Sequence, residues 1–81
     1  MKKKLVEIHW IDAEADSGWT SDDPRTDSPK ILKTYGLLVR KTDQWVIHAD
    51  TFDSQNNHWA GKGKIPRGMV KKIRVIETVD V

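Results

Sequence analysis

Hydrophobic and polar residues alternate with a period of two near the start of the chain. Within residues 5–11, Val6, Ile8 and Trp10 fall on one face of an extended backbone. The other face is mixed and carries Leu5, Glu7, His9 and Ile11. A period of two in a run rich in β-branched and aromatic residues predicts a β-strand. We therefore expect the first strand at residues 5–11, with its more apolar face in the core.

Four further segments have the composition of strands and are separated by polar or turn-forming residues. These segments are residues 31–40, 45–52, 58–65 and 70–79. The separators predict turns at 41–44 and 53–57 and a tight turn, of 3₁₀ type, at Pro66-Arg67-Gly68. Together with the first strand, they predict an all-β protein.

Individual residues refine these strands. Gly36 interrupts the second strand, where a glycine commonly marks a bulge or a sharp bend. Gly61 and Gly63 weaken the fourth strand. In the last strand, the candidate core residues are Val70, Ile73 and Val75.

Residues 12–29 break the alternation and are rich in Asp, Ser, Gly, Thr and Pro. This composition predicts a long first loop that has room for one helical turn. Trp19 is its only large apolar residue, so we expect Trp19 to hold the loop against the strands. Five short strands, a long first loop and one turn before the last strand are typical of a single small barrel of SH3-like or Sm-like type, spanning residues 1–81. A five-stranded OB barrel is the alternative.

The short length and the composition of the chain favour an oligomer. A chain of 81 residues without cysteine has a small core and no disulfide or thiolate metal site to support it. Four tryptophans supply large apolar surfaces. We therefore expect a homo-oligomer. No signal peptide is indicated, and the longest apolar run, residues 37–39, cannot span a membrane, so the expected location is the cytoplasm.

Charge is distributed unevenly, although the net charge is only +2. Residues 54–76 contain no acid and carry Lys62, Lys64, Arg67, Lys71, Lys72 and Arg74, whereas residues 12–27 carry six acids and one cation, Arg25. Clustered cations attract phosphates, but lysines also protect the edges of small sheets from pairing with other chains. Both interpretations stay open. If the cluster binds a ligand, the expected partner is an anionic nucleotide or a nucleic acid, and the candidate residues are Tyr35, Trp59, Lys62, Lys64, Arg67 and Lys71.

Catalytic and metal-binding patterns are weak. Residues 12–23 resemble the start of a calcium loop, but Gly18 falls one position late and Asp23 stands where a bidentate glutamate is required. Spacing does not bring the three histidines into a zinc site, and each serine lies in a loop without a partnering base. The segment 61–64 has two glycines and two lysines but lacks Walker spacing. We expect no cofactor, no metal and no enzymatic activity.

Several short motifs resemble a widespread group of small, uncharacterised tailed-phage proteins. They are Trp10-Ile11-Asp12-Ala13, Trp19, residues 34–39 and residues 65–73. This resemblance implies a phage accessory protein in the cytoplasm of an infected bacterium. The segment 65–68 is also similar to the turn before the last strand of Sm-like proteins, although an Sm-type nucleotide signature is missing.

Taken with the basic cluster, the resemblance favours a non-enzymatic protein that captures a phosphate-bearing ligand. Its sharpest form is the sequestration of a nucleotide immune signal, which would inhibit a host defence against phage. One alternative is a small barrel that binds single-stranded RNA or DNA, with Trp59 or Tyr35 stacking on bases. Another is a module that contacts virion or host proteins through its tryptophans.

Overall fold

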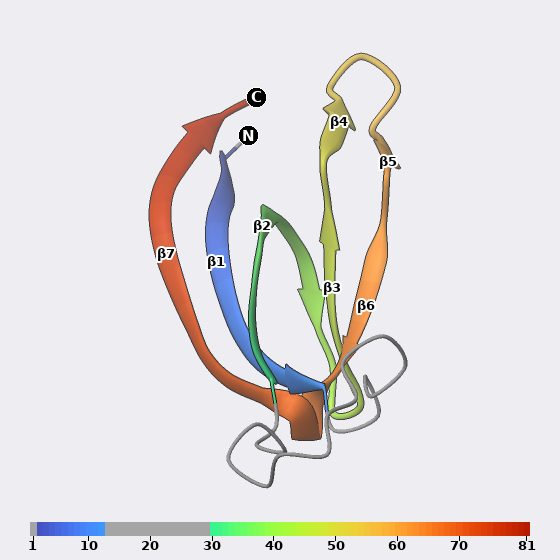
Figure 1. Cartoon of the computed structure of the whole chain (residues 1–81). Coiled ribbons are helices and arrows are strands. Elements are labelled where there is room, and N and C mark those ends of the chain that lie inside the picture. The colour runs from blue at the N-terminus through green and yellow to red at the C-terminus, as the bar shows by residue number, and fades with distance from the viewer. Residues whose placement is uncertain (1, 13–29) are drawn as a thin grey trace, which may run out of the picture.

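Strands dominate the computed structural model of this protein, which describes residues 2–12 and 30–81 (Figure 1). The elements are β1 (Lys2–Asp12), β2 (Lys30–Lys41), β3 (Trp45–Ala49), β4 (Thr51–Asp53), β5 (His58–Ala60), β6 (Gly63–Pro66), the 3₁₀ helix η2 (Arg67–Met69) and β7 (Val70–Asp80). The expected all-β class is confirmed, and so is the 3₁₀ turn before the last strand. No helix in the described ranges is long and apolar enough to cross a membrane.

Five strands form one antiparallel sheet in the order β6, β3, β2, β1, β7, and β4 pairs with β5 in a separate hairpin. The last strand therefore lies beside the first. As described, the sheet is open and is not closed into a barrel. The sheet has the predicted number of five strands, but it does not show the expected closure into an SH3-like or Sm-like barrel.

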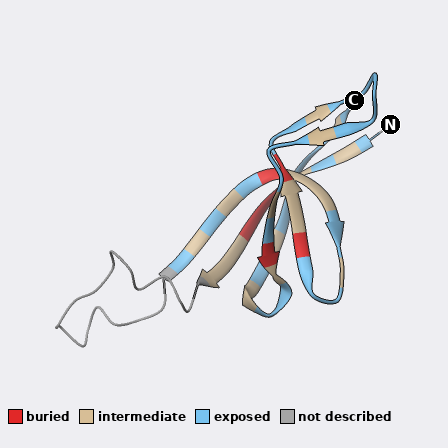
Figure 2. Cartoon of the chain, turned by 90° about the vertical axis from the view of Figure 1, so that its right-hand side faces the viewer, coloured by how far each residue is buried: buried red, intermediate tan, exposed pale blue. Residues whose placement is uncertain are grey.

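The hydrophobic core lies between two halves of this sheet, one formed by β1 and β7 and the other by β3 and β6. Its buried members come from β1, β3 and β6 and are Val6, Ile8, Val46 and Ile65 (Figure 2). Partly buried side chains pack against them, namely Trp10, Leu38, Val70 and Ile73. The predicted core face of the first strand is thus confirmed. Val75 is a wrong prediction: it is 47% exposed, because it lies on the edge strand β7, where no further strand covers it.

The second strand curves strongly and joins the two halves (Figure 1). Gly36 is buried in this strand opposite Val6. A Cβ atom on Gly36 would lie 2.9 Å from the Ala49 carbonyl oxygen of β3. The glycine therefore permits a close approach of the backbones of β2 and β3. The irregularity in strand pairing comes slightly later, between Leu38 and Arg40.

The predicted third and fourth strands are each divided in two, which corrects the expected continuous strands at 45–52 and 58–65. The first division falls at Asp50 and the second at Gly61 and Lys62. Gly61 has a φ of +66°, a left-handed conformation that ends a regular strand. The resulting hairpin of β4 and β5 carries the predicted polar turn, in which the Asp53 carboxylate accepts hydrogen bonds from Gln55 and Asn56.

Three expectations fall outside the described residues. They are the long first loop, the packing of Trp19 and the calcium-like segment after Asp12.

Candidate functional site

Two rows of polar side chains cross the face of β2, β1 and β7 that points away from the core. In one row, His9 of β1 is opposite Lys33 of β2 and Lys72 of β7. In the other, Glu7 of β1 is opposite Tyr35 and Arg74. Residues that lie directly opposite each other in neighbouring strands project from the same face of the sheet. These six residues define what we call the outer face.

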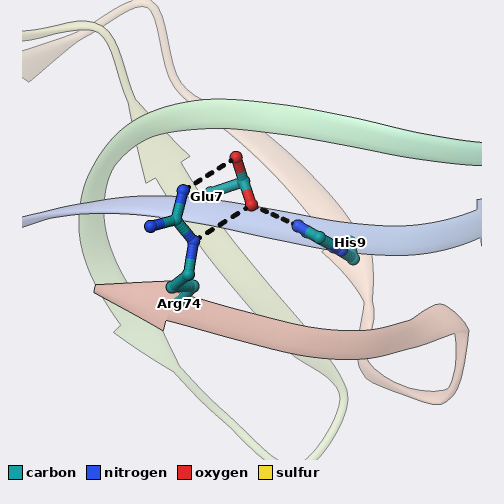
Figure 3. Close-up of polar contacts among 3 residues, drawn as sticks. All are labelled: Glu7, His9 and Arg74. Carbon is teal, nitrogen blue, oxygen red and sulfur yellow. Dashed lines mark hydrogen bonds and ion pairs between the residues drawn. The ribbon is translucent and has the colours of Figure 1, made fainter. Parts of the chain in front are cut away.

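Glu7 is the centre of the outer face. It lies between Val6 and Ile8 in sequence and is 6% exposed, so its charge requires partners. Arg74 donates from Nε to Oε1 and from Nη2 to Oε2, both at 3.2 Å, and His9 Nε2 also contacts Oε1 (Figure 3). The Glu7 carboxylate thus receives a bidentate arginine from β7 and an imidazole from its own strand, β1.

These contacts shift the ionisation of the groups involved. Hydrogen bonds from Arg74, then from His9 and Tyr35, lower the pKa of Glu7 far below its ordinary value. The hydrogen bond that the Tyr35 hydroxyl donates to Glu7 raises the pKa of Tyr35. Glu7 is therefore a fixed anion that holds three neighbouring side chains in place.

The outer face is accessible to a ligand because Tyr35, Lys33 and Lys72 are exposed to solvent. Tyr35 is 57% exposed although its hydroxyl is tied to Glu7, and both lysines are exposed. Half of the Arg74 side chain is also exposed, at 51%. An anchored aromatic ring among cations can stack on a planar group while the cations contact phosphates. Glu7 and His9 pair an acid with an imidazole, but the six residues of the outer face include no serine, threonine or cysteine that could act as a nucleophile.

The structure distributes the predicted ligand residues over several places. Tyr35 lies on the outer face, and Lys71 is the unpaired residue of a bulge on β7 beside it. Lys64 and Arg67 lie instead near Trp45, at the other half of the sheet. Because Lys64 and Arg67 lie outside the outer face, the predicted ligand residues do not form one continuous site.

Trp59 packs within the molecule. Its ring lies 4.6 Å from that of Phe52 in the hairpin, and Lys3 Nζ is about equally close to both rings, at 5.0 and 4.8 Å. Lys62 is exposed in the link between β5 and β6. In this arrangement Trp59 ties the hairpin to β1 through a cation–π contact.

The glycines beside Lys62 also have neighbours within the chain. A Cβ on Gly61 would lie 2.2 Å from the Asp50 carboxylate, and one on Gly63 would lie 2.7 Å from the His48 ring. The two glycines therefore leave room for the side chains of His48, in β3, and of Asp50, which directly follows β3. Close packing accounts for them without a bound phosphate.

The three histidines lie in different surroundings. His9 contacts Glu7, His48 is partly buried next to Gly63, and His58 is exposed on the hairpin. Burial lowers the pKa of His48. Within residues 2–12 and 30–81, no three His, Asp or Glu side chains are grouped so that they could hold a metal ion.

Of the six residues of the outer face, only Tyr35 was among the predicted ligand residues, although Lys72 and Arg74 belong to the basic stretch of residues 54–76. Glu7 offered the best signal, because an acid in the middle of an apolar strand needs a partner when it is buried. Its partner Arg74 lies 67 residues away in sequence, and only the pairing of β1 with β7 brings the two together.

Comparison with known proteins gives no assignment: no family model, curated protein or solved structure matches this chain.

Proposed function

We propose that this protein is a non-enzymatic binding protein for phosphate-bearing ligands, and that its outer face binds single-stranded nucleic acid. The observation that supports this proposal is the exposed Tyr35 ring held among Lys33, Lys72 and Arg74. Stacking on an aromatic ring is worth about 1–3 kcal/mol per base and tolerates any base. An extended strand would place a base on Tyr35 and its phosphates near the flanking cations.

Glu7 contributes by holding the groups that touch the ligand. A free arginine must lose side-chain entropy when it binds a phosphate, whereas Arg74 is already oriented by two hydrogen bonds. The remaining guanidinium surface is exposed. The outer face is therefore arranged before the ligand arrives, and Glu7 neutralises only part of its positive charge.

The fold is compatible with this function. The position of β7 next to β1, the 3₁₀ turn before β7 and the curvature of β2 support a relationship to small SH3-like or Sm-like barrels. Small barrels of several kinds bind single strands on a sheet face. The phage origin and the cytoplasm of an infected host stay predictions.

The dependence of affinity on salt tests the proposal. Three phosphate contacts, by Lys33, Lys72 and Arg74, predict a slope of about −2 in a plot of log affinity against log salt. Affinity for a short oligothymidine should then fall about twentyfold between 50 and 200 mM salt. In a Lys33→Ala/Lys72→Ala variant the slope should be about −0.7.

Lys62→Ala is the control, because Lys62 is exposed and lies outside the outer face. It should keep the slope of the unmodified protein. The measurement is fluorescence anisotropy of a labelled oligonucleotide at four salt concentrations. An unchanged slope in the double variant would place the binding site elsewhere, and no binding by any form would reject the proposal.

A second candidate is the capture of a nucleotide, such as an immune signal, between copies of the chain. The observation that favours it is exposed apolar surface on the edge strand β7, where Val75 is 47% and Ile76 is 42% exposed. A second chain would cover this surface. Sedimentation should then give a mass above that of a monomer, and a cyclic oligonucleotide should bind more tightly than a linear strand. A monomer that prefers linear strands would exclude this candidate.

A further inference from the structure

A second cluster of aromatic and basic side chains lies on β3 and β6. Trp45 is opposite Pro66, and Ile47 is opposite Lys64, so these side chains share one face. Lys64 Nζ lies 5.4 Å from the centre of the Trp45 ring. Trp45 is 36% exposed, so one part of its indole surface is open to solvent.

Hydrogen bonds fix the position of Arg67 beside this pair. Its backbone N–H donates to Gln44 and its Nη1 donates to the Thr42 carbonyl oxygen, at 2.8 and 2.9 Å. The Trp45 N–H in turn donates to Thr42 Oγ1 at 2.9 Å. The turn between β2 and β3 is thereby tied to η2. The bond to Thr42 uses one of the five N–H donors that a guanidinium carries.

This cluster and the outer face lie on opposite sides of the core. Ile8 of β1 and Val46 of β3 meet in the same buried cluster. Glu7 and Trp45 are their neighbours in sequence, and successive side chains of a strand point to opposite faces. Both therefore point away from the core, one from each half of the sheet.

We propose that Trp45, Lys64 and Arg67 form a second site for a single-stranded oligonucleotide, so that one chain holds two strands. This inference rests on the function proposed above. A base would stack on Trp45 while Lys64 Nζ moves from the ring to a phosphate, which Arg67 also contacts. Because the two sites face away from each other, we expect each to hold a separate segment, so that one chain bridges two segments.

Charge reversals on opposite sides of the core test the bridge. Lys64→Glu changes the second cluster and Lys72→Glu changes the outer face, while Lys62→Glu is a control with the same change in net charge. All three lysines are exposed, so little effect on folding is expected. The probe is a hexathymidine, and native mass spectrometry with calorimetry gives the number bound per chain.

The unmodified protein and the Lys62→Glu control should bind two hexamers per chain. Lys64→Glu and Lys72→Glu should each bind one, with the altered site weakened by at least about tenfold. Two hexamers on Lys64→Glu would overturn the second site but leave the proposed function intact. Two hexamers on Lys72→Glu would overturn the proposed outer-face function.

Two further outcomes decide the remaining cases. If one hexamer binds per chain and both reversals weaken it, a single strand wraps around the molecule and bridging is refuted. If donor- and acceptor-labelled hexamers show energy transfer on the unmodified protein, and Lys64→Glu abolishes it at unchanged oligomer mass, bridging within one chain is supported. Energy transfer that survives in Lys64→Glu would assign it to association of chains.

Discussion

Replacement of Gly36 by alanine tests how the two halves of the sheet are joined. The new Cβ would lie 2.9 Å from the Ala49 carbonyl oxygen, about 0.5 Å inside the 3.4 Å at which ordinary contacts begin. That oxygen belongs to the backbone of a buried residue paired with Leu37, so it cannot withdraw as a flexible side chain would. Overpacking of this kind costs about 1–3 kcal/mol.

Gly68→Ala provides the matched control. A Cβ at Gly68 would meet nothing within 4 Å. Both substitutions reduce the entropy of the unfolded chain, a gain of about 0.4–1 kcal/mol that is common to the two variants. The difference in unfolding free energy between them therefore isolates the clash, and we expect about 1–3 kcal/mol.

Urea unfolding followed by circular dichroism measures this difference. With a slope of about 1 kcal/mol per molar urea for a chain of this size, the midpoints of the two variants should differ by about 1–3 M. Melting temperatures should differ by at least about 4 °C in the same direction. Equal midpoints for Gly36→Ala and Gly68→Ala would refute the close approach of β2 and β3.

Two further predictions concern the core and the buried carboxylate. Ile8→Ala should cost about 2–5 kcal/mol of unfolding free energy because Ile8 is fully buried, while Ile31→Ala should change it little because Ile31 is 68% exposed; equal losses in urea unfolding would contradict the described core. The depressed pKa of Glu7 means that its ionised form adds stability above about pH 4.3, and that this stability is lost as pH falls further. The stability difference between the unmodified protein and Glu7→Gln should therefore be largest near pH 7 and shrink below about pH 4, and a difference independent of pH would exclude this role.

Local patterns in the sequence predicted the local structure well. The period of two in residues 5–11 identified β1 and its core face, and Pro66-Arg67-Gly68 identified the turn before β7. The break at Asp50 was missed; at this position the Asp50 carboxylate occupies the space beside Gly61, which lies in another segment. Sequence alone does not show which segments will meet in this way.

The candidate site depended even more on strand pairing. Tyr35 could be proposed from its residue type, but its connection to Arg74 exists only because Glu7 lies between them in the sheet. Clustering of charge along the chain pointed to the basic stretch of residues 62–74, which includes Lys72 and Arg74 but not Lys33. The cations of the outer face come from two strands, so the sequence does not place Lys33 near Lys72.

The basic residues of β7 also have a consequence for solubility. β7 is a long edge strand, and such edges template aggregation unless charged side chains keep other strands away. Lys71, Lys72 and Arg74 supply those charges next to the exposed Val75 and Ile76. Any event that neutralises the two lysines, such as acetylation, would remove repulsion beside this exposed apolar surface. Loss of binding and precipitation should therefore accompany each other in this protein.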